Sequence, residues 1–245
     1  MTHLKYQTSV IHPLECIKEG WEAIKPNYWL IFAITLVGLL IASIVPFAIL
    51  LGPMNCGIYY CVLRQLRCEE IKFGDLFRGF DYFGPAIVAT LVIILPIIVF
   101  SIINWITMFG YIIAASEAIN RGNTEAIIGL YAIVFGEALV FAIVIAVLHT
   151  LLIFAYPLIV DFQLSGIEAF KTSARAVWAN LSGVAGLILW QILLGFAGML
   201  VCGVGIYFVL PVMYAGVAVA YCKVFPRQSH GNLGAPPPES YNWNT

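Results

Sequence analysis

The chain has 245 residues, of which 62% are hydrophobic and only 10% charged, and its mean hydropathy is +0.95. Soluble domains carry about 25% charged residues, so this composition excludes an ordinary soluble protein and indicates an integral membrane protein. The net charge of −1 and the pI near 6.4 argue against nucleic acid as a partner. Residues 1–20 are polar and of mixed charge, without the basic start and apolar core of a signal peptide.

The first unit spans residues 13–66 and follows a polar N-terminus, residues 1–12. It begins with an amphipathic helix that has a proline in its first turn. Two apolar runs come next, 28–44 and 47–66, and Pro46 marks the turn between them. Each run can cross a hydrocarbon core of roughly 30 Å, which takes about 20 helical residues. The expected apolar side of the amphipathic helix is Leu14, Ile17, Trp21 and Ile24.

The second unit, residues 67–160, contains an amphipathic helix over 73–83 and an oversized hairpin. Its two apolar runs, 84–115 and 126–160, are joined by a polar loop, 116–125. At 1.5 Å per residue the longer arm would measure about 50 Å, well beyond a membrane core. Extra spans, a projecting hairpin and outer portions that fold back along the membrane surface are the three ways to accommodate it. The expected apolar face of the amphipathic helix is Phe73, Leu76, Phe77, Phe80 and Phe83.

The third unit, residues 161–225, begins with a Ser-x-x-Glu capping box, Ser165 and Glu168, which predicts a helix start. Two apolar runs follow, 184–202 and 206–225, separated by a short glycine-rich turn. The unit is therefore again an amphipathic helix followed by a hairpin. The expected apolar face of the helix is Ile167, Phe170, Ala174, Val177, Trp178 and Leu181.

An internal repeat relates the first and third units. Residues 20–25 (Gly-Trp-Glu-Ala-Ile-Lys) resemble residues 166–171 (Gly-Ile-Glu-Ala-Phe-Lys), and Pro53 corresponds to Pro211. The tail, residues 226–245, is Pro-rich and is expected to be extended.

The distribution of basic residues sets the expected topology. With six spans, eleven of the twelve Lys and Arg residues fall on one side of the membrane, and only Arg121 falls on the other. A seventh span would divide this set. By the positive-inside rule, both termini and all three amphipathic helices are cytoplasmic. We therefore predict an all-α, multi-pass protein of the bacterial inner (cytoplasmic) membrane, with six transmembrane helices as three hairpins, each preceded by a cytoplasmic-side amphipathic interfacial helix.

Few residues offer chemistry. Polar groups within membrane spans are the first candidates for function, and the most prominent are Glu137, His149 and Asn104, as transport groups or interhelical contacts. Twelve helical steps leave Glu137 and His149 about 120° apart, so they do not share a face. Asp161 is interpreted as a boundary residue before the capped helix. The six cysteines form no Cys-x-x-Cys pair and are expected to act as small buried hydrophobic residues, so we predict no metal and no cofactor.

The chain resembles a loose family of bacterial and archaeal six-span membrane proteins of unknown function. Some of these are similar to the membrane domain fused to glycerophosphodiester phosphodiesterases. The resemblance covers most of residues 13–225, and the catalytic domain is absent here, so it implies no activity. It rests on residues 76–83, on 157–161 followed by 168–171, and on 203–205 with Pro211.

Three functions are compatible with the sequence, none of them enzymatic, because no catalytic motif occurs in a suitable context. The first is an accessory or scaffold subunit of an inner-membrane complex, with the lipid bilayer and protein subunits as partners. The alternative is a small-molecule or lipid carrier, and a membrane-shaping role is a third possibility. If the outer arms of the second hairpin project from the membrane, another chain should cover them. This possible partner surface is Tyr111, Ile112, Ile113, Ile127, Ile128, Leu130 and Tyr131.

Overall fold

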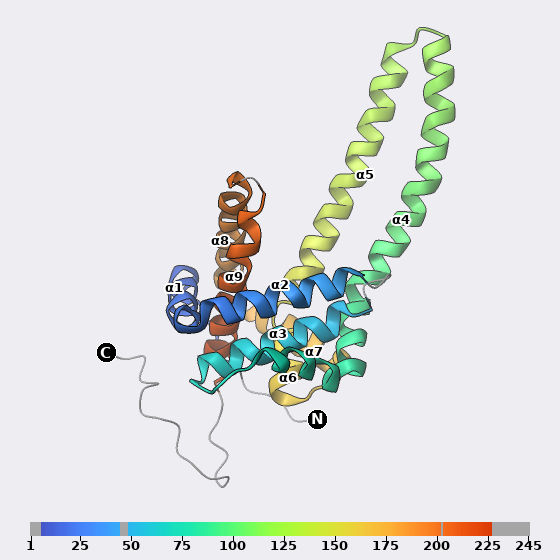
Figure 1. Ribbon diagram of the computed structural model, residues 1–245. Helices are drawn as coiled ribbons and strands as arrows, with labels where there is room; N and C mark the ends of the chain where they lie inside the picture. Colours follow the sequence, from blue (N-terminus) through green and yellow to red (C-terminus); the bar gives the residue numbers. More distant parts are fainter. Residues whose placement is uncertain (1–5, 45–48, 202, 227–245) are drawn as a thin grey trace.

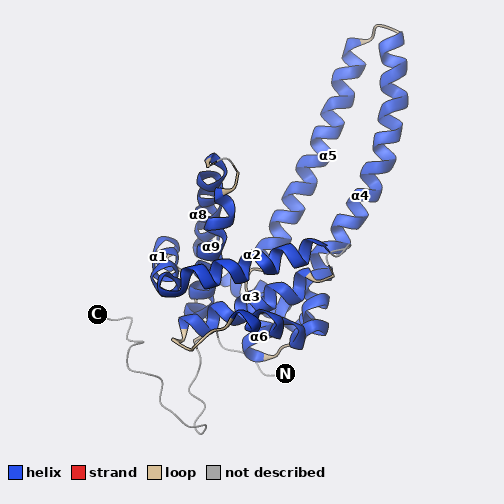
Figure 2. Cartoon of the chain, viewed as in Figure 1, coloured by secondary structure: helices blue, strands red, loops and turns tan. Residues whose placement is uncertain are grey.

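The computed structural model describes residues 6–44, 49–201 and 203–226, and within these ranges the chain is helical without strands (Figures 1 and 2). The predicted turn at Pro46 and the predicted tail lie outside the described residues, apart from Pro226. In chain order the elements are α1 (Pro13–Ile24), η1 (Lys25–Asn27), α2 (Tyr28–Ile44), α3 (Leu51–Leu66), η3 (Phe73–Tyr82), α4 (Phe83–Asn120), α5 (Thr124–Leu151), α6 (Ala155–Phe162), α7 (Gly166–Ala179), α8 (Leu181–Leu200) and α9 (Gly205–Val224).

Five helical segments are long and apolar enough to cross a membrane, judged by length and composition. They are Pro13–Ile44, Phe73–Glu117, Thr124–Phe162, Leu181–Leu200 and Gly205–Val224. The expected all-helical class with membrane-spanning helices is thereby confirmed at this level. The second predicted span is represented by α3, which has 16 described residues and is not among the five.

Two hairpins, α4–α5 and α8–α9, rise from a common base on the same side, and α2 and α3 run across that base (Figure 1). We use "base" for α1, α2, α3, η3, α6 and α7 together with the inner ends of the two hairpins. Helices α4 and α5 are continuous to the tip of the long hairpin, so its outer portions do not fold back. The predicted loop 116–125 was too long: helix occupies most of it, and the connection is residues 121–123.

The inner end of α5 differs from the sequence prediction of one apolar run to residue 160. The helix ends at Leu151, three residues turn, and α6 begins at Ala155. Ser173 of α7 supports this break, because its hydroxyl donates to the carbonyl of Leu151 (2.6 Å) and accepts from the amide of Phe154 (3.2 Å). A buried side chain thus replaces hydrogen bonds that an unbroken helix would make.

Helix α3 forms the centre of the base. It is buried along most of its length and contacts η3, α2, α6, α4 and α9. Its polar residue Asn55 accepts a hydrogen bond from the hydroxyl of Tyr214 (2.6 Å) and donates to the carbonyl of Leu51 (2.8 Å). A buried amide with these partners is satisfied, so Asn55 ties α3 to α9 without exposing polar atoms to the core.

Each amphipathic helix packs on a helix of one of the hairpins. For η3 and α7 this is the hairpin that precedes them in the chain, whereas α1 packs on the last hairpin. Helix η3 packs on α3, α7 on α4, and α1 on α9. A glycine lies at each crossing, and a Cβ there would strike the neighbouring backbone. All three glycines are followed by a large apolar and then an acidic residue, so the motif occurs once more than the sequence analysis found. The three occurrences are Gly20-Trp21-Glu22, Gly79-Phe80-Asp81 and Gly166-Ile167-Glu168.

The apolar faces expected at the membrane surface are for the most part not the faces that are buried against the rest of the protein. Small residues and a minority of the expected apolar residues face inward, whereas Trp21, Phe80 and Ile167 are exposed. In α7 the only expected residue that is fully buried is Val177. The inward-facing set comprises Cys16, Ile17, Gly20 and Ile24 in α1; Leu76 and Gly79 in η3; and Gly166, Ala169, Ser173, Ala176 and Val177 in α7.

Candidate functional site

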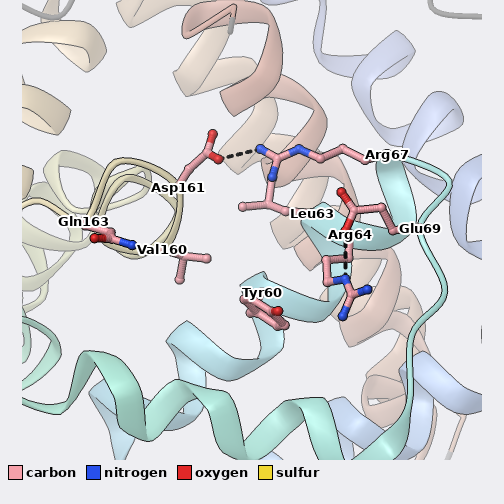
Figure 3. A pocket seen from close by; sticks show the side chains of 8 residues that line it. All are labelled: Tyr60, Leu63, Arg64, Arg67, Glu69, Val160, Asp161 and Gln163. Carbon is pink, nitrogen blue, oxygen red and sulfur yellow. Dashed lines mark hydrogen bonds and ion pairs between the residues drawn. The ribbon is translucent and has the colours of Figure 1, made fainter. Parts of the chain in front are cut away.

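A polar cavity of about 240 Å³ lies in the base between the end of α3 and α6 (Figure 3). Its charged residues come from the last turn of α3, from the segment directly after it and from the last turn of α6, so two distant parts of the chain form it. The lining residues are Tyr60, Leu63, Arg64, Arg67, Glu69, Val160, Asp161 and Gln163.

Arg67 and Asp161 form the main ion pair of this cavity. The Nη2 atom of Arg67 donates to Oδ1 of Asp161 at 2.7 Å, and the hydroxyl of Tyr221 donates to Oδ2 at 3.1 Å. The Asp161 side chain is only 5% exposed and that of Arg67 25%. Burial works against the charge of Arg67, but Asp161 more than offsets this and raises the pKa of the guanidinium above its ordinary value. Asp161 is thus more than a boundary residue, because it joins α6 to α3 and α9.

Arg64 forms the second charged cluster. Its Nε donates to Oε2 of Glu69 at 2.8 Å, and its Nη1 donates to Oδ2 of Asp75 at 3.4 Å. The same Asp75 oxygen accepts the backbone amide of Lys72 at 2.9 Å and so caps η3. Both arginines of the cavity already face carboxylates, so the arrangement is suited to fastening α3, η3 and α6 together rather than to binding a free anion.

A second polar site lies on the projecting hairpin, where Thr107 of α4 meets Glu137 of α5. The hydroxyl of Thr107 is 3.0 Å from one carboxylate oxygen of Glu137 and 3.3 Å from the other. That hydroxyl also lies 3.1 Å from the carbonyls of Ile103 and Asn104. Among the described residues, the Thr107 hydroxyl is the only hydrogen-bond donor to Glu137. Because this hydroxyl has one hydrogen, Glu137 competes for it with the two backbone carbonyls.

Among the three predicted polar candidates, the structure brings none together through side chains. Asn104 is near Glu137 but contributes its backbone carbonyl to Thr107. His149 lies twelve residues further along α5, about 18 Å away at 1.5 Å per residue. Thr107 has no distinguishing motif and was not predicted from the sequence. The pairing of Arg67 with Asp161 was not predicted either, although both residues were expected on the same side of the membrane.

The predicted partner surface lies on the outer half of the hairpin and is exposed or half-buried throughout. Ile112, Ile113 and Ile128 are exposed. Tyr111 and Tyr131 contact each other edge to face across the hairpin, with ring centroids 5.9 Å apart. These residues present an apolar surface on both arms.

The cysteines fit the predicted role only in part. Cys16, Cys56 and Cys61 are buried, Cys222 is half-buried, and Cys68 is exposed just after α3. Cys202 lies outside the described residues. Within the described ranges no three His, Cys, Asp or Glu residues are placed to hold a metal ion.

Comparisons with protein-family models, with curated proteins and with solved structures find no match to this chain. The resemblance to the six-span family therefore stays a prediction. The fold itself defines the class as an all-helical protein with five segments long and apolar enough to span a membrane.

Proposed function

We propose that this chain is an integral protein of the bacterial cytoplasmic membrane. Its base lies on the cytoplasmic face, the hairpins α4–α5 and α8–α9 enter from that face, and both termini are cytoplasmic. In this proposal α2 and α3, which were predicted from the sequence to be the first two spans, run across the base and do not cross the membrane. Lys5 and Arg227 lie outside the described residues; of the other ten Lys and Arg residues, nine lie in the base, and Arg121 lies at the α4–α5 tip. This asymmetry supports the proposed orientation.

The dimensions of the α4–α5 hairpin support a full crossing. The packing of α4 against the core ends near Ile93, and that of α5 begins near Leu151. Each projecting arm therefore has about 27 residues and measures about 40 Å, close to the thickness of a bilayer with its headgroups. The charged tip with Arg121 then reaches the far aqueous phase.

We further propose that the protein is a non-catalytic accessory or scaffold subunit of a membrane complex. The observation that carries this proposal is Glu137, which is thirteen residues, or about 20 Å, from the outer end of α5. In a crossing hairpin this carboxylate lies near the middle of the bilayer, where an ionisable group is costly. Among the described residues its single donor is Thr107, which it shares with two backbone carbonyls, so a polar group on a helix of another chain would complete its hydrogen bonding.

The exposed apolar side chains of the amphipathic helices support the same placement. Trp21, Phe80 and Ile167 point away from the base, beside acidic neighbours. Such faces suit the boundary between headgroups and acyl chains. We accordingly propose that α1, η3 and α7 are interfacial and that each begins one copy of a repeated unit.

The scaffold proposal is tested by replacing Glu137. Glu137→Leu should release a stoichiometric partner that is present with the unaltered chain after gentle detergent extraction and native mass measurement. Glu137→Gln should retain part of the complex, because an amide still forms hydrogen bonds. Glu125→Gln, at the hairpin tip, is the matched control and should leave the complex intact. A monomer in every case, or equal loss from Glu125→Gln, would count against the proposal.

A proton-coupled or lipid carrier is the second candidate, favoured by the same mid-membrane carboxylate. It requires Glu137 to change its protonation during transport. Glu137→Gln in proteoliposomes should then abolish flux of the candidate solute, whereas a scaffold role leaves flux unchanged.

A further inference from the structure

We propose that α8–α9 is a re-entrant hairpin, which enters the bilayer from the base and turns back inside the hydrocarbon core. Its tip then contacts acyl chains and does not reach the far aqueous phase. This proposal requires the base to lie at one face of a membrane, but it does not require Glu137 to bind a partner.

The first observation is the composition of the tip. No side chain in residues 192–206 is charged or carries nitrogen or oxygen. The residues that lead into and out of the turn are highly exposed, with Leu200 at 87% and Val204 at 58%. The tip of α4–α5 has the opposite character, since it carries an ion pair between Glu117 and Arg121. One chain thus provides both a tip suited to water and a tip suited to hydrocarbon.

The second observation is the reach of the hairpin beyond α1, which crosses its lower part. Pro13 lies against Gly186 of α8, and Gly20 lies against Ala215 of α9. Beyond this crossing α8 continues for 14 residues, about 21 Å, and α9 has ten, about 15 Å.

The interfacial placement proposed for α1 puts the membrane surface at this crossing, and the ion pair of its polar side lies further toward the base. Lys223 of α9 pairs with Glu19 of α1 at 2.8 Å, on the base side of the glycine contact. A hydrocarbon core is about 30 Å thick, so arms of 15–21 Å end near its middle. In Figure 1 the α8–α9 tip accordingly lies well short of the α4–α5 tip.

The third observation is that several backbone groups of the turn pair within the hairpin. The amide of Val201 donates to the carbonyl of Gly198 (3.3 Å), and that of Gly203 donates to Met199 (3.0 Å). Gly205 donates in turn to Val201 (3.3 Å). Gly203 has a φ of +73°, which glycine adopts without strain. An unpaired backbone group inside a bilayer costs several kcal/mol, so internal pairing is what a turn buried in hydrocarbon requires.

Cysteine labelling from the outer side tests the proposal. Val204→Cys is made in a chain with Cys202→Ala, so that the new thiol is the one near the tip. A membrane-impermeant maleimide is added to spheroplasts, and Arg121→Cys serves as the crossing control. We expect Arg121→Cys to react in intact spheroplasts and Val204→Cys to react only after detergent solubilisation. Reaction of Val204→Cys from outside, at the rate of Arg121→Cys, would overturn the proposal.

A depth measurement keeps the test independent of labelling chemistry. A spin label at Val204 in liposomes should be reached by oxygen far better than by a water-soluble nickel chelate, and the order should reverse at Arg121. A Val204 label that the chelate reaches as readily as the Arg121 label would contradict re-entry. Because neither measurement involves the partner of Glu137, failure here leaves the scaffold proposal untouched, and failure of the scaffold proposal leaves re-entry standing.

Discussion

Replacing Gly79 by alanine should loosen the base, because η3 and α3 meet there through backbone atoms on both sides. A Cβ on Gly79 would overlap the carbonyl oxygen of Pro53 and lie 2.7 Å from the amide nitrogen of Gly57. An ordinary Cβ contact starts at 3.4 Å, so η3 would have to retreat by more than the 0.7 Å that the Gly57 contact alone requires. Leu76, which is fully buried on the same element, would be drawn out of the core with it.

Overpacking of a core costs about 1–3 kcal/mol, and the upper end applies to Gly79→Ala because backbone atoms cannot rotate away. For a chain of this size, about 3 kcal/mol lowers the melting temperature by about 6–12 °C. The assay is thermal unfolding in mild detergent, followed by the loss of the monodisperse peak in size exclusion. Gly74→Ala is the matched control, since a Cβ there meets nothing within 4 Å. Equal melting of Gly79→Ala, Gly74→Ala and the unaltered chain would refute the reasoning.

Three further variants test two contacts that hold the base together, in the same assay. Ser173→Ala leaves the buried amide of Phe154 and the carbonyl of Leu151 without the hydroxyl, which should cost about 1–3 kcal/mol; melting unchanged from that of the unaltered chain would show that the α5–α6 break does not depend on Ser173. Asp161→Asn removes the carboxylate from Arg67 and should lower the free energy of unfolding by about 2 kcal/mol. Breaking a fully buried pair costs about 3–5 kcal/mol, and the cost is smaller here because the Arg67 side chain is 25% exposed. Arg67→Met combined with Asp161→Leu should cost less than Asp161→Asn alone, since no buried charge is left unpaired; a larger loss would argue that the pair itself stabilises the base.

Hydropathy was sufficient to predict the helical class and the long arms of the second hairpin, because an apolar run has few alternatives to helix in a membrane. It could not predict the break after Leu151, since the residues that turn there, Leu152-Ile153-Phe154, are apolar and contain no glycine or proline. The break depends on the hydroxyl of Ser173, 22 positions beyond Leu151. Such a contact is visible only once α7 is placed beside α5.

The inward faces of the amphipathic helices could not be predicted for a different physical reason. The sequence prediction placed large apolar residues such as Trp178 and Ile167 at the membrane surface, but it did not say which residues pack on the hairpins. In a bilayer these residues can face lipid, and close approach of helices through small residues decides the packing. Gly166 and Ala169 therefore face inward, and Trp178 is exposed.

The candidate sites show the same division. Glu137 could be selected from the sequence because a charge in an apolar run is rare. Its donor Thr107 is 30 positions away, and Asp161 is 94 positions from Arg67. These pairings follow from the register of α4 against α5 and of α6 against α3, which periodicity within one helix does not determine.

The central claim is that the base and the α4–α5 tip lie on opposite sides of the membrane. The most direct test is to measure from which side of the membrane one thiol at each place can be labelled. Cys68 is an exposed thiol of the base, and Arg121→Cys places one at the tip. An impermeant maleimide should label Arg121→Cys in intact spheroplasts, and it should reach Cys68 only in inverted vesicles. Labelling of both thiols from the same side would contradict the transmembrane hairpin, the proposed orientation and the mid-membrane position of Glu137 together.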